Sequence, residues 1–379
     1  MILNPQEMVE AERHLIEGGI NPESLMDEAG LGIANAVSQF FPQPGTLFVF
    51  VGHGHNGGDA LVAARHLKAR GWITELKFAT SLNNLKPLTS KKLHEFEQEP
   101  ARPNRLYDSG QKLPLISIDG LLGIGASGDL RPGYLELAIE INSLRDNYHA
   151  VTFSLDIPSG LDGKSGNAYE GAVVADFTLT IAYPKTGLLR DHSINYVGRL
   201  VLINLPNIYP LPGQGDHDAF LINSFSLGGF LNKSLHDAHK GINGHVGIIG
   251  GNQGMIGASV LSGIAALKGG AGLVTIIARE DMYSLIASIS PPEIMIVPVK
   301  SYTEVNEMPL DTIAIGPGLG KGEWDSEVLE LLTSEIRPLI IDADALNLLA
   351  RNNPSELQNA PGPRLLTPHP GEMKRLDPE

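Results

Sequence analysis

The sequence predicts an α/β fold, in which strands alternate with helices in two successive domains. Short apolar runs of β type alternate with segments whose apolar residues recur at helical spacing. The alternation occurs on both sides of a stretch rich in proline and glycine, residues 206–215. Glycine-rich loops follow several of the expected strands. This pattern is typical of a mostly parallel sheet that helices cover on both faces.

The elements of the first domain follow in order from these patterns. Residues 7–41 are expected to be helical, because Leu25, Ile33 and Val37 belong to one apolar stripe. The expected strands span residues 46–51, 73–79, 115–119, 150–156, 176–182 and 198–203. The clearest helices between them span residues 60–70 and 133–146.

The same alternation continues in the second half of the chain. Its expected strands span residues 245–249, 273–278, 312–315 and 338–342, and its expected helices 257–268, 280–287, 324–333 and 344–350. We interpret residues 206–215 as a linker between domains at residues 1–212 and 220–379. The chain ends at Glu379, shortly after a motif-like loop, and no expected element closes the second domain. We therefore expect this domain to be the N-terminal part of a longer one.

Composition narrows the classes of function. The 379 residues suggest about two or three domains, at roughly 150 residues each. The net charge of −15 argues against nucleic acid or an anionic membrane as a partner, because both favour a basic surface. The absence of cysteine excludes disulfides and thiolate-bound zinc. No signal-peptide pattern and no apolar run of roughly 18 residues occurs, so we expect a cytoplasmic protein.

Three loops of the first domain each follow an expected strand, at residues 52–59, 119–129 and 156–162. In open α/β sheets, ligands bind outside the carboxyl ends of the strands, so these loops are expected to converge. Glycines allow the backbone to approach a ligand, and free N–H groups at the start of a helix attract anions. Because the first loop runs from a strand into a helix, we expect a phosphorylated ligand.

Convergence of these loops would bring Asp59, Asp119 and Asp156 together. Three carboxylates beside a phosphate would repel it, and two arrangements avoid this repulsion. A cation with oxygen ligands could bind among the loops, with contributions from Asn56, Asp119 and Ser159. Alternatively, one carboxyl group could have a raised pKa and carry a proton. Both alternatives stay open at this point.

The spacing Gly52-x-Gly54-x-x-Gly57 also matches the dinucleotide-binding fingerprint, which alone is a weak signal. An ordinary dehydrogenase places an acidic residue at the end of the next strand, where it binds the ribose. Here Glu75 lies inside that expected strand, which ends at Thr80-Ser81. The sequence therefore disfavours a dehydrogenase.

The first half of the chain resembles the YjeF N-terminal family, the NAD(P)H-hydrate epimerases, over about residues 1–205. The motifs that carry the resemblance are Leu25-Met26-Asp27-Glu28-Ala29-Gly30, Gly54-His55-Asn56-Gly57-Gly58-Asp59, Ile118-Asp119 with Gly123-Ile124-Gly125, and Leu155-Asp156-Ile157-Pro158-Ser159-Gly160. The resemblance implies a Rossmann-like three-layer domain that interconverts the R and S hydrates of NADH and NADPH, written NAD(P)HX below. It also implies a bound potassium ion.

The resemblance further implies the residues of the site. Asn56, Asp119 and Ser159 would hold the potassium ion. The substrate would be contacted by His55, Asn56, Gly57, Gly58, Asp59, Gly123, Ile124, Gly125, Ala126, Ser127, Gly128, Asp129 and Asp156. Our candidate catalytic acid or base is Asp156, with Asp59 as the second choice. The family has asparagine and glycine where this chain has His55 and Ala60, so we expect a changed affinity rather than a loss of binding.

The second half carries glycine-rich and polar loops in a similar arrangement. These are Gly250 to Ala258, Gly316-Pro317-Gly318-Leu319-Gly320, Asp342 to Asn347, and Thr367-Pro368-His369-Pro370-Gly371-Glu372. Over about residues 225–376 this half resembles the YjeF C-terminal family, the ADP- or ATP-dependent NAD(P)H-hydrate dehydratases of ribokinase-like fold. The resemblance implies that Ala258, Gly318 and His369 contact the hydrate and that ADP or ATP binds with magnesium. The order of the two halves is that of bifunctional hydrate-repair enzymes.

One departure limits the expected activity of the second half. In the family, a Lys-Gly loop and a Gly-Thr-Gly-Asp motif follow the His-Pro-Gly-Glu loop, and neither occurs in these 379 residues. Phosphoryl transfer then lacks its main electrostatic support, so we expect little dehydratase activity here and both activities in a longer parent chain. A ribokinase-like kinase of a small molecule and an inactive nucleotide-binding module stay open as alternatives. We also expect a homo-oligomer.

Overall fold

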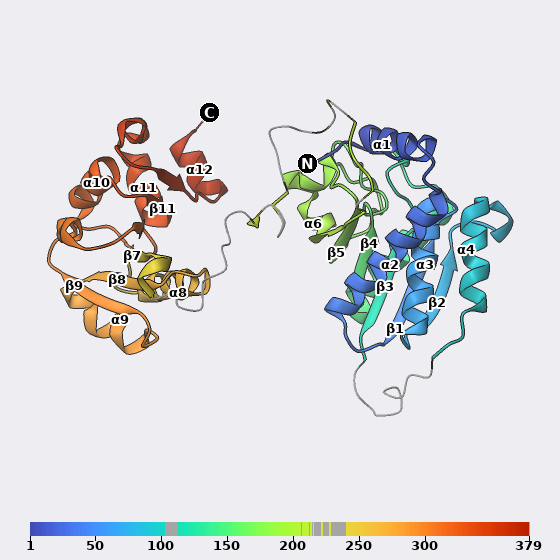
Figure 1. The fold of residues 1–379 in the computed structure, drawn as a ribbon, viewed down its shortest axis with the longest axis horizontal. Helices are drawn as coiled ribbons and strands as arrows, with labels where there is room; N and C mark the ends of the chain where they lie inside the picture. The colour runs from blue at the N-terminus through green and yellow to red at the C-terminus, as the bar shows by residue number, and fades with distance from the viewer. Residues whose placement is uncertain are drawn as a thin grey trace. The chain divides into compact units, whose positions relative to one another are not determined.

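The computed structural model describes residues 1–102, 113–205, 207–211, 213, 215, 221–222, 227–228 and 240–378. The chain divides into two compact units, Met1–Gly229 and Phe230–Glu379. Each unit contains one six-stranded sheet in which neighbouring strands are parallel (Figure 1). The expected α/β class is therefore confirmed. Most of the stretch 212–220, where the expected boundary falls, lies outside the described residues, as does Pro206 of the expected linker.

The sheet of the first unit has the strand order β2-β1-β3-β4-β5-β6. Its strands are β1 (Thr46–Val51), β2 (Ile73–Phe78), β3 (Leu115–Gly120), β4 (Val151–Leu155), β5 (Phe177–Ile181) and β6 (Arg199–Ile203). All six were expected, to within one residue at each end. The strand order reverses between β1 and β3, and the carboxyl ends of strands at such a reversal flank a ligand crevice.

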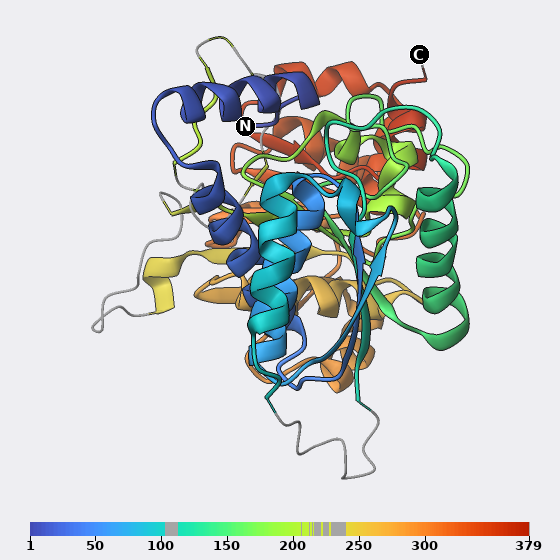
Figure 2. The same ribbon diagram turned by 90° about the vertical axis from the view of Figure 1, so that its right-hand side faces the viewer.

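Helices cover both faces of this sheet (Figure 2). They are α1 (Pro5–Glu17), α2 (Pro22–Phe40), α3 (His55–Ala69), α4 (Pro87–Gln98), α5 (Pro132–Tyr148) and the short α6 (Ile194–Val197). Side chains alternate along β1, so Leu47 and Val49 pack with α2 and α3, whereas Phe50 packs with α5. The helices α1 and α2 begin at Asn4 and Asn21, whose side chains cap their first turns.

The third helix begins earlier than expected. We placed its start at residue 60, where the helical spacing of Leu61, Ala64 and Leu67 begins, but α3 begins at His55. Both glycines serve close packing: a Cβ on Gly57 would lie 2.1 Å from the carbonyl oxygen of Gly52, and one on Gly58 would lie 2.5 Å from the Met26 side chain. Tertiary packing thus overrides the low helix propensity of glycine at this point.

The sheet of the second unit has the strand order β12-β11-β10-β7-β8-β9. Its strands are β7 (His245–Ile249), β8 (Leu273–Arg279), β9 (Met295–Val299), β10 (Thr312–Ile315), β11 (Leu339–Ile341) and β12 (Arg364–Leu366), and its helices are α8 (Ile256–Lys268), α9 (Tyr283–Ile289), α10 (Asp325–Ser334), α11 (Ala343–Arg351) and α12 (Pro370–Leu376). The sequence did not predict β9 and β12. Both lie at sheet edges, where Pro298 is tolerated in β9 and β12 is only three residues long.

No helix among the described residues combines the length and apolarity that crossing a bilayer requires. The longest helix of the first unit, α2, spans 19 residues and buries one face against the protein core. Its apolar residues therefore serve packing within the unit.

The packing around Gly57 gives a test of this fold. Gly57→Ala is expected to destabilise the first unit by about 1–3 kcal/mol, because its Cβ would meet backbone atoms that cannot rotate away. Gly125→Ala is the control, since no atom lies within 4 Å of its ideal Cβ, and it should change stability by less than about 0.5 kcal/mol. Urea unfolding followed by Trp72 fluorescence in a Trp324→Phe background measures both. Equal unfolding midpoints would contradict the described packing.

Candidate active site

A cavity of about 490 Å³ lies at the carboxyl end of the first sheet. Its walls come from α1, α2, the start of α3, and the segments that follow β3, β4 and β6. Of the residues expected from the sequence, it is lined by His55, Asn56, Asp59, Gly123, Ile124, Gly125, Ala126 and Asp156. The loops that follow β1, β3 and β4 therefore share one cavity.

Other expected contact residues lie elsewhere. Gly57 and Gly58 are buried within the first turn of α3, against Gly52 and the Met26 side chain. Ser127 and Gly128 line a much smaller neighbouring pocket. Asp129 is exposed and lines neither cavity. The structure thus brings together only part of the residue set that the resemblance implies.

Asp156 occupies a constrained position directly after β4. Its φ of +65° lies in the left-handed region, which is unusual for a residue with a side chain, and the residue is 7% exposed. Its Oδ1 accepts a hydrogen bond from the Ile181 amide at 3.1 Å and a second from the Lys185 ammonium group. Lys185 is 0% exposed and also donates to the Ile181 carbonyl at 2.8 Å. A buried ion pair therefore forms one wall of the site.

Two further carboxyl groups line the same cavity without a hydrogen bond to any described residue. Burial raises the pKa of Asp59 well above its usual range, and the negative charges of Glu12 and Asp156 raise it further. Burial also raises the pKa of Glu12 to about 7; the Asp156 charge adds to this and Lys185 opposes it. The cavity therefore combines one ion-paired carboxylate with two carboxyl groups that retain protons more readily.

Sequence reasoning missed Lys185 and Glu12. The sequence could have indicated Glu12, because it lies four residues after Met8 and so on the same side of α1, which faces the protein. A signal for Lys185 was weaker: it is the only charged residue in the apolar stretch 177–189. Neither residue belongs to a motif, so only the folded structure places them beside Asp156.

The three expected metal ligands lie around the loop after β3. The Asp119 carboxylate is fully buried and accepts from Ser159 Oγ at 2.6 Å, the Ser159 amide at 2.9 Å, Ser154 Oγ at 2.9 Å and the Leu121 amide at 3.2 Å. Asn56 Nδ2 donates to the carbonyls of Leu122 at 2.7 Å and Leu155 at 3.2 Å, while Leu122 N donates to Ser159 Oγ at 3.0 Å. Leu122 therefore links Asn56 to the Asp119–Ser159 pair.

This donor set fits a monovalent hard cation better than a transition metal. It offers amide, hydroxyl, carboxylate and carbonyl oxygens, which are the ligands that such ions prefer. The two donated bonds of Asn56 Nδ2 orient the amide and leave Oδ1 without a hydrogen bond to the described residues. Burial raises the pKa of Asp119, so a nearby cation would offset the cost of its charge. Among the described residues, no cluster of three His, Cys, Asp or Glu side chains could hold a metal ion.

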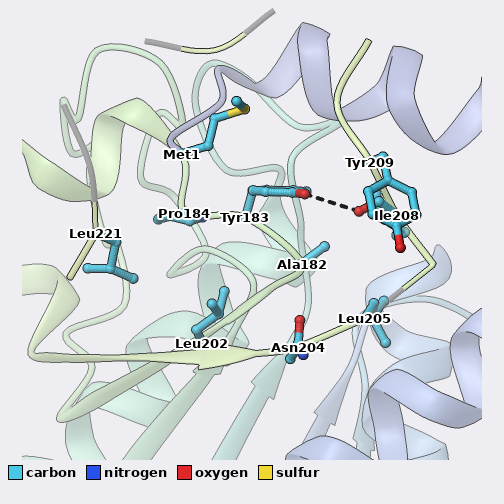
Figure 3. Close-up of a pocket in the computed structure, with 10 residues that line it drawn as sticks. All are labelled: Met1, Ala182, Tyr183, Pro184, Leu202, Asn204, Leu205, Ile208, Tyr209 and Leu221. Carbon is cyan, nitrogen blue, oxygen red and sulfur yellow. Dashed lines mark hydrogen bonds between the residues drawn. The ribbon is translucent and has the colours of Figure 1, made fainter. Parts of the chain in front are cut away.

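A second cavity, of about 210 Å³, adjoins the first (Figure 3). The two cavities share Leu205 and Ile208 in their walls. The Tyr183 hydroxyl donates a hydrogen bond to the Ile208 carbonyl at 3.1 Å, and burial raises the pKa of Tyr183. This bond fixes the chain segment that separates the two cavities.

In the second unit, the loops after β7 and β10 contact each other. Asn252 N donates to the Gly318 carbonyl at 2.7 Å, and Gly251 N donates to the Pro317 carbonyl at 3.1 Å. A Cβ on Gly318 would lie 3.1 Å from the Ala258 Cβ, so these two expected contact residues are adjacent. His369 instead caps α12, where its Nδ1 accepts from the Gly371 amide at 3.0 Å. The contacts described for His369 do not join it to the other two.

Similarity to known proteins covers both units. Residues 22–187 match the family model of the YjeF-related protein N-terminus, and residues 246–379 match that of NAD(P)H-hydrate dehydratase. The bifunctional NAD(P)H-hydrate repair enzyme of Coxiella burnetii is 33% identical over 373 residues, which cover 97% of this chain and 74% of that protein. The corresponding enzyme of Escherichia coli is 35% identical over 368 residues, which cover 94% of this chain and 68% of that protein.

One solved structure is similar to part of this chain. It is the ADP/ATP-dependent NAD(P)H-hydrate dehydratase of Bacillus subtilis, co-crystallised with ATP and magnesium. It is 33% identical, with a TM-score of 0.33, and the match covers 39% of this chain and 52% of that one.

The raised pKa of Glu12 predicts a pH-dependent stability. The pKa of Glu12 is about 7 in the folded chain, against an ordinary value of 4.5. Between pH 4.5 and pH 7, the folded chain therefore keeps a proton on Glu12 that the unfolded chain has released. Stability therefore falls as the pH rises through this window. Glu12→Gln removes the titrating group and with it this fall in stability. The substitution should therefore stabilise the first unit by about 1 kcal/mol more at pH 8 than at pH 6.

Urea unfolding at the two pH values measures this difference. The exposed Glu28 provides the control, because Glu28→Gln should have the same effect at both pH values. An effect of Glu12→Gln that does not depend on pH would contradict the described environment of Glu12.

Proposed function

We propose that the first unit of this chain interconverts the R and S forms of NAD(P)HX. The chain belongs to the family of bifunctional NAD(P)H-hydrate repair enzymes. One observation carries this proposal. Asp156, Asp59 and Glu12 line a single cavity, but only Asp156 is paired with a cation, so the site offers both a proton acceptor and proton donors. Paired carboxyl groups in different environments are the arrangement that acid–base catalysis requires.

Inversion of the hydrated carbon of the nicotinamide ring requires that a bond to that carbon be broken and re-formed on the other face. Proton transfer by a positioned acid and a positioned base lowers the barrier to both steps. We assign Asp156 as the base, because Lys185 occupies Oδ1 and Oδ2 forms no hydrogen bond with the described residues. We assign Asp59 as the acid, because burial raises its pKa and so favours its protonated form.

The start of α3 supports recognition of a phosphorylated substrate. Gly54 caps this helix without a side-chain hydrogen bond, and the first N–H groups of a helix lack acceptors within it. Lys86 lines the same cavity and adds positive charge. Burial, and then the Lys86 charge, lowers the pKa of His55, so we propose that His55 acts as a neutral hydrogen-bonding group in place of the family's asparagine.

We propose that potassium is the cation held by Asn56, Asp119 and Ser159. When bound, the ion would neutralise the buried charge of Asp119 and stabilise the loops that follow β1, β3 and β4. These residues lie beside the catalytic cavity rather than between Asp59 and Asp156, since only Asn56 of the three lines it. The ion is therefore assigned to maintaining the site and not to proton transfer.

For the second unit we propose the dehydratase half of the family reaction, with ADP or ATP and magnesium. The adjacency of Ala258 and Gly318 supports these two as contacts for the hydrate, and His369 remains the third proposed contact. Nucleotide-dependent phosphorylation of an unrelated alcohol would favour a kinase, and binding without turnover would favour an inactive module.

The assigned acid and base predict the kinetics of two variants. Asp156→Asn and Asp59→Asn should each lower kcat by about 100-fold or more, with KM within about threefold, because each removes one proton-transfer group. The rate is measured by chromatography of R-NADPHX while a separate dehydratase removes the S form. Asp146→Asn, an exposed change at the far end of α5, is the control. Full activity of Asp156→Asn would refute its assignment.

The potassium site predicts an ion-specific stabilisation. Potassium at about 100 times its Kd should stabilise the first unit by about 2.7 kcal/mol, because it binds only the folded state. The effect is measured as a rise in Tm in potassium chloride against choline chloride at equal ionic strength. Asn56→Ala should abolish the difference, together with any potassium dependence of epimerisation. An equal Tm in the two salts would exclude the site.

A further inference from the structure

We propose that Lys185, held in place by residues 1–17, is the positioning residue of the Asp156 carboxylate. This inference rests on the proposed epimerase function of the first unit. It adds an N-terminal segment to the active site, although the residues that match the family model begin at 22. The proposal depends on three features of the structure: the burial of Lys185, the backbone contacts around it, and the charges that face Asp156.

The burial of Lys185 makes its charge dependent on Asp156. The residue is 0% exposed, and its ammonium group donates to Asp156 Oδ1, to the Ile181 carbonyl at 2.8 Å and to Thr180 Oγ1 at 3.4 Å. A buried ammonium ion is costly unless it is paired and its donors are satisfied. Among the described residues, Asp156 is the only carboxylate in contact with it. The pair therefore fixes where Oδ1 points and leaves Oδ2 available in the cavity.

The N-terminal segment holds the backbone on both sides of Lys185. Leu3 N donates to the Pro184 carbonyl at 3.0 Å, and Thr186 N donates to the Leu3 carbonyl at 3.0 Å. These two bonds form a parallel β-bridge between Leu3 and Lys185, and the Leu3 side chain is fully buried in the core of the unit. The bridge therefore fixes the backbone at Lys185, from which the side chain reaches Asp156.

The same segment closes the cavity. The helix α1 begins two residues after Leu3, at a capping box formed by Asn4 and Glu7. Its inner side supplies Val9, Glu12 and Ile16 to the cavity wall. One short segment thus holds the lysine loop and places Glu12 beside the proposed acid and base.

The charges that face Asp156 explain why the lysine matters for proton transfer. Glu12 from α1 and Asp59 from α3 are the other carboxyl groups coupled to Asp156, and Lys185 is the cation in contact with it. Without Lys185, three carboxyl groups would share a buried site with no contacting cation. Loss of this cation would disfavour the charged form of Asp156 and weaken it as a base.

The test uses the full chain with three substitutions. Lys185→Met keeps the length of the side chain and removes its charge, whereas Lys185→Arg keeps the charge. We expect Lys185→Met to lower kcat by about 100-fold with KM within about threefold, and to move the acidic limb of the pH–rate profile upward by at least one unit. Lys185→Arg should restore the wild-type pH profile and at least a tenth of kcat. Lys164→Met, an exposed change, is the control and should alter neither.

A second readout does not depend on activity. The side-chain carboxyl carbon of Asp156, assigned in ¹³C NMR spectra by its loss in Asp156→Asn, should titrate at least one pH unit higher in Lys185→Met than in the wild type. This shift supports the positioning role even if the wild-type chain does not epimerise NADPHX, in which case only the proposed function fails. A folded Lys185→Met variant with an unchanged titration and pH profile would overturn the inference, whatever its kcat. Epimerisation by the wild type would in that case leave the proposed function intact.

Discussion

The parallel sheet of the first unit imposes the constraint on which its site depends. All six strands run in one direction, so the segments that follow β1, β3 and β4 emerge at one edge of the sheet. Asp119 lies at the end of β3 itself, and Asp59 and Asp156 follow β1 and β4, with more than 30 residues of sequence between one and the next. Because strand direction is the same throughout, their convergence needs no special interaction among the loops themselves.

Bringing carboxyl groups together in a buried place creates an electrostatic problem that the structure solves in three different ways. Asp119 is surrounded by hydrogen-bond donors, Asp156 is paired with Lys185, and Asp59 has neither, so burial raises its pKa. The same chemical group is thus held in three different environments. Asp59 and Asp156 both line the cavity and differ in environment, so one can donate a proton and the other can accept one.

Glycine residues have different structural functions in different parts of the two units. Gly57 and Gly58 belong to the motif that suggested ligand binding, yet both are buried in the first turn of α3, where their small size permits close packing. Gly123 and Gly125, by contrast, line the cavity itself. In the second unit, Gly318 combines a φ of +62° with close contact to Ala258, so it meets a conformational and a steric requirement at once. A motif therefore indicates where a site lies more reliably than which of its residues reach the ligand.

The sequence by itself determined the α/β class, ten of the twelve strands and the loops that form the first cavity, because these depend on local periodicity and on the direction of parallel strands. It also showed the family resemblance, since the motifs are contiguous. Only the tertiary structure decided that α3 starts at His55, that Ser127 to Asp129 lie outside the main cavity, and that Glu12 and Lys185 complete the site. These outcomes depend on packing between distant segments and on burial, which changes the cost of a charge without leaving a pattern in the neighbouring residues.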